Sequence, residues 1–249
     1  MRQGADTLKR VHFELGGKNP VIVFDDADLE RAVDAAVFMI YSLNGERCTS
    51  SSRLLVQDTV YDEVCAKVAE RAARIRVGHP LDPETVIGPL IHPVHEKKVL
   101  SYFEKAVAEG ATIATGGEKL GETGCYVAPT LFTHATNEMA VSREEIFGPV
   151  LTVMPFDTVE EAISMANDTD YGLAASVWTK NIDKALMVTR RVQAGRFWVN
   201  TTLAGGPELP LGGFKQSGWG REAGMYGVEE YTQVKSVHVE IGKRTPWIA

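Results

Sequence analysis

Two short segments contain the residue types that covalent attack on a carbonyl group requires. One is FELGGKNP at residues 13–20, which includes Glu14, and the other is NGERCT at residues 44–49, which includes Cys48. A thiol in a loop can act as a nucleophile, and a carboxylate can take a proton from water. Cys48 and Glu14 therefore predict a reaction in which an acyl group is first bound to sulfur and then released to water.

Cys48 lies between a predicted helix and a predicted strand, where a loop can present its sulfur. Its neighbours are small or polar, and Arg47 brings a positive charge next to it. A free thiol has a pKa of about 8.5 and reacts as the thiolate, so this setting favours reactivity. A cysteine is also often a small buried apolar residue, and local composition leaves both roles open for Cys48. Cys65 and Cys125 lack such a setting and are expected to be structural.

Glu14 ends an apolar strand and is followed at once by a glycine turn. The strand contributes Val11 and Phe13, and the turn contains Gly16 and Gly17. A carboxylate between the two would be partly removed from water, which raises its pKa towards that of a useful base. The alternative that these residues alone leave open is an ordinary surface glutamate at a strand end.

At these two segments the sequence resembles the aldehyde dehydrogenase superfamily, and the resemblance extends from the first residues to about Gly242. It implies that Cys48 is the nucleophile and Glu14 the general base of an aldehyde oxidation through a thiohemiacetal and a thioester. Relatives that transfer the acyl group to coenzyme A generally lack this glutamate, so its presence implies that water releases a carboxylic acid. The implied substrate is a small-molecule aldehyde, whose identity the sequence leaves open.

A third segment, REEIFGPV at residues 143–150, is also typical of this family. The resemblance implies that Glu145 binds the hydroxyl groups of the nicotinamide ribose and that Phe147 packs near the nicotinamide ring. A carboxylate can accept from two neighbouring hydroxyls, and an aromatic side chain can orient a flat ring. The implied cofactor is therefore NAD or NADP, and the sequence leaves the choice between them open.

The glycine-rich residues 218–224 do not follow a strand, so they are not interpreted as a dinucleotide-binding loop. Residues 201–211 are instead expected to line the substrate entrance, and residues 212–222 to surround the substrate tunnel. Within them, Glu222 is expected either in a proton path or in a surface salt bridge.

The alternation of strand-like and helix-like segments predicts an α/β fold with a mostly parallel sheet flanked by helices. Thr59 and Asp62, and likewise Thr158 and Glu161, have the spacing of a capping box at a helix start. Strands are expected at residues 20–24, 53–56, 111–115, 126–132, 150–156, 173–178 and 196–200. Helices are expected at residues 28–40, 59–76, 94–109 and 181–192, and after Thr158.

The resemblance divides the chain into a remnant of the dinucleotide-binding domain (1–16), a catalytic domain (17–228) and a tail strand for subunit contact (229–249). Family members have a further half before this chain's first residue, so we expect most of the cofactor-binding half to be absent here. Oxidation would then be complete only with that half. The alternatives are a non-catalytic fragment or binding subunit of the same fold, and cofactor-free ester hydrolysis by Cys48 and Glu14.

Composition excludes several other classes of protein. A net charge of −7 argues against nucleic-acid binding. No apolar run reaches the roughly 18 residues needed to cross a bilayer, and the first six residues lack the apolar stretch of a secretory signal. Three cysteines without paired spacing indicate reduced thiols and a cytoplasmic location.

His92 and His95 flank Pro93 with no third ligand nearby, so no metal site is expected. Besides the aldehyde, the expected partners are further copies of the chain in a homo-oligomer, or a separate cofactor-binding half. Neither nucleic acid nor membrane is expected as a partner.

Overall fold

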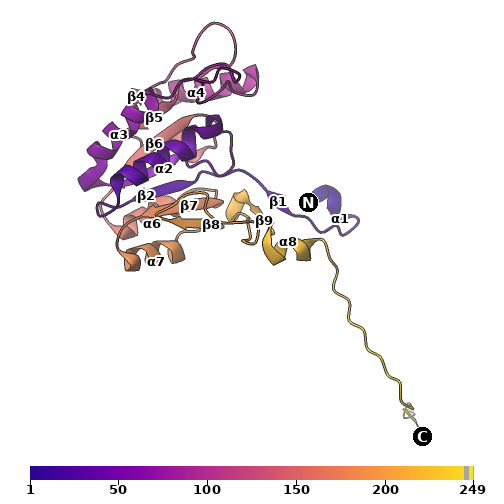
Figure 1. Ribbon diagram of the computed structural model, residues 1–249. Coiled ribbons are helices and arrows are strands. Elements are labelled where there is room, and N and C mark those ends of the chain that lie inside the picture. The colour runs from indigo at the N-terminus through magenta and orange to yellow at the C-terminus, as the bar shows by residue number, and fades with distance from the viewer. Residues whose placement is uncertain (244–246, 249) are drawn as a thin grey trace.

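Residues 1–243 and 247–248 are described by a computed structural model of the chain. A seven-stranded sheet forms its centre, with the strands in the order β4-β5-β6-β3-β2-β7-β8 (Figure 1). All neighbouring strands are parallel except β4 and β5. The mostly parallel α/β sheet predicted from the sequence is therefore confirmed. The strands are β2 (Pro20–Val23), β3 (Arg53–Gln57), β4 (Thr112–Thr115), β5 (Thr130–Thr133), β6 (Val150–Phe156), β7 (Ala174–Trp178) and β8 (Arg196–Val199).

Helices cover both faces of this sheet, which explains why its central strands are continuous apolar runs. On β2, Val21 and Val23 pack in the same apolar cluster as α2 and α3, whereas Ile22 packs with α4, α6 and α7 on the other face. The described helices are α1 (Arg2–Ala5), α2 (Leu29–Tyr41), α3 (Tyr61–Ala73), α4 (Pro93–Ala108), α5 (Ala140–Arg143), α6 (Val159–Asn167), α7 (Ile182–Arg191) and α8 (Gly224–Glu230). Three short 3-10 turns accompany them, at η1 (Ser42–Gly45), η2 (Asp58–Val60) and η3 (Lys215–Ser217).

Side-chain caps fix where several of these helices begin. The side chain of Asp28 accepts from the N–H of Arg31 at α2, and that of Thr158 accepts from the N–H of Glu161 at α6. His92 caps α4 through Nδ1, which accepts from the N–H of Val94. None of the helices within the described part of the chain is long and apolar enough to cross a membrane.

The capping box expected at Thr59 and Asp62 is wrong. Residues 58–60 form η2 instead, and α3 begins at Tyr61 without a side-chain cap. Thr59 Oγ1 contacts Asp25 Oδ2 at 3.4 Å, so the threonine side chain is used in a tertiary contact and not at the helix end.

A small two-stranded ribbon stands beside the main sheet (Figure 1). Its strands, β1 (Phe13–Glu14) and β9 (Gly218–Trp219), are antiparallel and come from opposite ends of the sequence. The indole N–H of Trp219 also donates to the carbonyl oxygen of Val11 at 2.7 Å. The first 14 residues therefore pack on the C-terminal part of the chain, and their assignment to a separate domain remains a prediction.

The tail after α8 runs away from the body of the molecule (Figure 1). Residues 232–243 form no helix or strand in this single chain, and Val234 and Ile241 are almost wholly exposed. The expected tail strand is thus not formed by pairing within the chain, and its pairing with another subunit remains a prediction. Residues 244–246 and 249 of that expected segment lie outside the described residues.

Candidate active site

The three segments singled out in the sequence lead into neighbouring strands of the sheet. Residues 13–19 lead into β2, residues 44–52 lead into β3, and residues 143–149 lead into β6. Because β2, β3 and β6 are parallel, their amino ends lie at the same edge of the sheet. The structure therefore brings the predicted nucleophile, base and cofactor residues to one edge.

The loop that carries Cys48 is shaped by a left-handed turn. Leu43, Asn44 and Gly45 have φ values of 54°, 57° and 68°. A Cβ atom on Gly45 would collide with the carbonyl oxygen of Gly148, so only glycine allows the two loops to approach this closely. The turn thus packs the cysteine loop directly against the segment that contains Glu145 and Phe147.

The half-buried thiol of Cys48 lies within electrostatic reach of two carboxylates. Burial raises the pKa of the Cys48 thiol, and the carboxylates of Glu14 and Glu145 raise it further. The N–H groups of Thr49 and of Cys48 itself act in the opposite direction, because they stabilise the thiolate. Both predicted site carboxylates are therefore near enough to the sulfur for their negative charge to disfavour its ionisation.

Arg47 interacts electrostatically with Cys48, as expected from its place in the sequence, and it also binds the end of a helix. Its guanidinium donates to the carbonyl oxygen of Met39 at 3.1 Å and to Ser42 Oγ at 3.2 Å, both at the end of α2 and the start of η1. The positive charge next to Cys48 in the sequence therefore also caps a helix.

Glu14 is half-buried in β1, opposite Gly218 of β9. Burial raises the pKa of its carboxyl group, and the charge of Glu222 raises it further, whereas His12 and Arg221 lower it. Within the described residues, Glu14 Oε1 is buried and has no hydrogen-bond partner. The partial desolvation expected at this strand end is therefore present.

The carboxylate of Glu145 is fixed against the glycine turn that follows Glu14. Its Oε1 accepts from the N–H of Gly17 at 2.9 Å, and a Cβ atom on Gly16 would overlap the carboxylate. The Nζ atom of Lys98 donates to the carbonyl oxygen of Glu145 at 3.0 Å. Gly16 and Gly17, which follow Glu14 closely, thus leave space for the carboxylate of Glu145 and bind it.

Phe147 has a strained backbone, with a φ of 61°. Its carbonyl oxygen lies 2.6 Å from Nε2 of His95, and the two rings are 6.4 Å apart between centroids. His95, which lies on α4, therefore fixes the backbone of Phe147, the residue predicted to pack near the nicotinamide ring. The sequence pattern had placed His95 only at a helix start.

Two cations at the entries to β2 and β3 were missed in the sequence because charged residues are normally exposed. Lys18 is only 1% exposed, and in the described structure its Nζ has no hydrogen-bond partner. Burial and the charge of Arg53 lower the pKa of Lys18 to about 7. Arg53 is itself fully buried and donates through Nε to the carbonyl oxygen of Lys18 at 2.9 Å.

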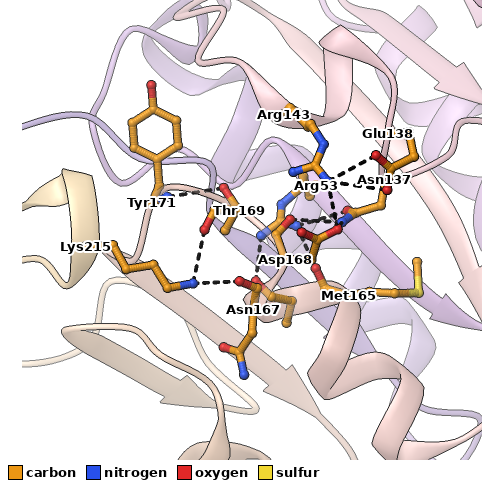
Figure 2. A network of polar contacts seen from close by, with 11 residues as sticks. Arg53, Asn137, Glu138, Arg143, Met165, Asn167, Asp168, Thr169, Tyr171 and Lys215 are labelled. Atoms are coloured by element: carbon orange, nitrogen blue, oxygen red, sulfur yellow. Dashed lines mark hydrogen bonds and ion pairs between the residues drawn. The ribbon is translucent and has the colours of Figure 1, made fainter.

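Figure 2 shows how Arg53 connects this edge to the end of α6. Its guanidinium donates to the carbonyl oxygens of Met165 and Ala166, both at 2.9 Å, while Asp168 pairs with Arg143 at 2.9 Å.

Lys215 extends the network to the segment that was expected to surround the substrate tunnel (Figure 2). Its Nζ donates to the carbonyl oxygens of Asn167 at 2.6 Å and Thr169 at 3.1 Å. The same segment continues into β9 and packs on Glu14. Glu222 lies near enough to affect Glu14, and within the described residues it forms no ion pair.

A model of the aldehyde dehydrogenase family matches residues 1–237 of the chain. A betaine aldehyde dehydrogenase of Cereibacter sphaeroides (strain ATCC 17025 / ATH 2.4.3) is 49% identical over 238 residues, which are 96% of this chain and 49% of that protein. The chain thus spans about half the length of this relative.

Solved structures agree with this match. The crystal structure of an NAD-dependent aldehyde dehydrogenase from Sinorhizobium meliloti has a TM-score of 0.96 and 47% identity, covering 100% of this chain and 49% of that one. The NAD+ complex of an aldehyde dehydrogenase from Bacillus cereus has a TM-score of 0.95 and 44% identity, covering 97% of this chain and 49% of that one. The chain belongs to the aldehyde dehydrogenase family.

Proposed function

We propose that this chain carries the nucleophile and the general base of an NAD-dependent oxidation of a small aldehyde to a carboxylic acid. The observation that supports this most is that the segments carrying Glu14, Cys48 and Glu145 pack against one another at one sheet edge. The relatives are about twice as long as this chain. We therefore propose that turnover is complete with the additional half that those relatives have.

Cys48 would add through its sulfur to the aldehyde carbon and form a thiohemiacetal, whose oxyanion can accept from the N–H of Cys48. The cofactor supplies the acceptor for the hydride that leaves this carbon. Glu14 would then take a proton from a water molecule as the water oxygen attacks the thioester. The sulfur leaves as the thiolate and a carboxylic acid is released. A raised pKa suits Glu14 to this exchange, because a stronger base accepts the proton more readily.

The residues fit the nicotinamide riboside part of the cofactor. Gly17 holds Oε1 of Glu145, and the absence of a side chain on Gly16 leaves space for the carboxylate. A fixed carboxylate can accept from two ribose hydroxyls, and the half-exposed Phe147 supplies an aromatic wall beside it. Relatives solved with NAD+ favour NAD over NADP for this chain.

The aldehyde itself is assigned only as a small molecule. Betaine aldehyde carries a quaternary ammonium group, which proteins commonly bind with aromatic faces. Residues 201–211, expected at the substrate entrance, contain no aromatic side chain and have Gly205 and Leu211 there. The name of the relative therefore gives no reason to assign betaine aldehyde. Three free thiols agree with a proposed cytoplasmic location.

The release of nitrophenol from an activated nitrophenyl ester tests the proposed chemistry without a cofactor. We expect the chain to give a burst equal to one acyl group per site, and Cys48→Ala to give none. Glu14→Gln should keep the burst but slow the later turnover by about 100-fold, because a general base contributes 10²–10⁴-fold. Cys65→Ala is the matched control and should behave as the unaltered chain. A burst that survives in Cys48→Ala would refute the assignment, and no burst from the unaltered chain would favour a non-catalytic role.

A further inference from the structure

The carboxamide of Asn19 joins three segments at the sheet edge. Asn19 is only 1% exposed, and its Oδ1 accepts from the N–H of Ala174 at 2.9 Å. Its Nδ2 donates to the carbonyl oxygens of Cys48 at 2.9 Å and Ser50 at 2.8 Å. A single side chain before β2 therefore holds the start of β7 and two carbonyl groups of the cysteine loop, those of Cys48 and Ser50.

The approach of Asn19 to the cysteine depends on Gly17. A Cβ atom on Gly17 would lie 2.7 Å from Asn19 Oδ1 and 2.9 Å from the carbonyl oxygen of Cys48, which is closer than side chains normally pack. The N–H of Ser50 donates to the carbonyl oxygen of Arg47 at 2.9 Å and closes a turn around Cys48. The cysteine loop is thus fixed both by its own turn and by the carboxamide of Asn19.

Holding a carbonyl oxygen also sets the direction of the N–H group in the same peptide unit. The peptide between Cys48 and Thr49 is trans, so its C=O and N–H groups point in opposite directions. Because Asn19 binds the carbonyl oxygen, the N–H of Thr49 must point away from Asn19. The N–H of Thr49 is one of the two groups that stabilise the ionised sulfur.

We propose that Asn19 is a positioning residue that orients the Cys48–Thr49 peptide, so that the N–H of Thr49 faces the sulfur and favours the reactive thiolate. The hydrogen bonds of the Asn19 carboxamide all go to backbone groups, so it would act on the thiol through this peptide. The proposal rests on the proposed function of Cys48 as the nucleophile. A simpler role would be to hold β2, β3 and β7 together, with no effect on the thiol.

The pH dependence of alkylation by iodoacetamide separates the two roles, because it measures ionisation of the thiol without substrate or turnover. The rate at Cys48 is followed by peptide mass spectrometry of the folded chain, with Cys65 and Cys125 as internal references. In Asn19→Ala the Cys48 midpoint should rise by about one pH unit, which makes alkylation at neutral pH about tenfold slower. The midpoints of Cys65 and Cys125 should not move.

Asn167→Ala is the matched control. The Asn167 carboxamide also joins two backbone groups, because Nδ2 donates to Arg191 at 2.8 Å and Oδ1 accepts from Gln193 at 2.7 Å. This control should lose stability while the Cys48 midpoint stays unchanged. If Asn19→Ala does not fold, Asn19→Ser decides by the same measurement, since its shorter hydroxyl cannot reach all three partners.

An unchanged or lowered Cys48 midpoint in a folded Asn19 variant would overturn the proposal and leave only the role of holding strands. Failure of the proposed function is seen separately, because the nitrophenol burst would then survive in Cys48→Ala while the alkylation midpoints could still be measured.

Discussion

The buried amine of Lys18 predicts an unusual dependence of stability on pH. Lys18 is 1% exposed, and burial together with the charge of Arg53 lowers its pKa to about 7. In an unfolded chain a lysine has a pKa of about 10.4. The folded state therefore favours the neutral amine at pH values where the unfolded state still binds a proton.

The direction of the effect follows from proton linkage. Below the folded pKa of about 7, both states bind the proton and the full cost of burying the charge is present. Between pH 7 and about 10.4 only the unfolded state is protonated, so the free energy of unfolding rises with pH by up to about 1.4 kcal/mol per pH unit. Above that range the cost has disappeared. Lys18 thus makes the chain more stable at alkaline pH.

Urea unfolding at pH 7.5 and pH 9.5, in the presence of a reductant, measures this contribution. Between these two values the Lys18 amine should add about 2 to 3 kcal/mol to the free energy of unfolding. In Lys18→Met the amine is replaced by an uncharged side chain of similar length, so this part of the rise should be lost. At pH 7.5 the variant should be at least as stable as the unaltered chain.

Lys97→Met is the matched control, because Lys97 is an exposed lysine on α4. It should leave the pH dependence of stability unchanged. If the unaltered chain and Lys18→Met show the same rise between pH 7.5 and pH 9.5, the amine of Lys18 is charged in the folded state and the reasoning is refuted.

Two further predictions concern the loop and the base. Gly45→Ala should lower the free energy of unfolding by more than about 2 kcal/mol, because the residue needs a φ of 68° and a Cβ atom would collide with Gly148. Gly121→Ala, where φ is 72° but nothing lies within 4 Å, should cost only about 1 kcal/mol in the same urea titration, and equal losses would contradict the collision. Glu222→Gln should move the acid-side midpoint of ester turnover to lower pH, because the charge of Glu222 raises the pKa of Glu14. A midpoint that stays in place would show that Glu14 does not control turnover.

The sequence was most informative where a local pattern decides the structure. The apolar run at residues 20–24 predicted β2, because a buried parallel strand needs apolar side chains on both faces. Asp28 and Thr158 predicted helix starts, because each cap is made within three residues. Thr59 has the same kind of pattern, yet its hydroxyl contacts Asp25, which lies 34 residues earlier. Local spacing could not reveal that competing partner.

The site was predictable only in part for the same reason. Cys48 and Glu14 stand in distinctive segments, so their positions could be recognised from the sequence. The burial of Lys18 and the contacts of Asn19 depend on Arg53 and Ala174, which reach them through the pairing of β2 with β3 and β7. No pattern within one segment contains that information.

The position of the candidate site at the amino ends of the strands has an electrostatic consequence. Ligands of open α/β sheets usually lie at the carboxyl ends, where helices begin. At the amino ends the preceding helices finish, and a helix C-terminus carries a partial negative charge and unpaired carbonyl groups. Here α2 finishes before the Cys48 loop, and α6 finishes beside Arg53.

Three cations at this edge bind those helix ends. Arg47 binds the end of α2, while Arg53 and Lys215 bind carbonyl groups at the end of α6. Arg47 also interacts with Cys48, whereas the charges of Glu14 and Glu145 disfavour ionisation of the thiol. Backbone N–H groups also stabilise the thiolate at this edge, and their direction depends on how the loop is held. A neutral side chain that fixes one peptide, such as Asn19, can do this without adding a charge to the site.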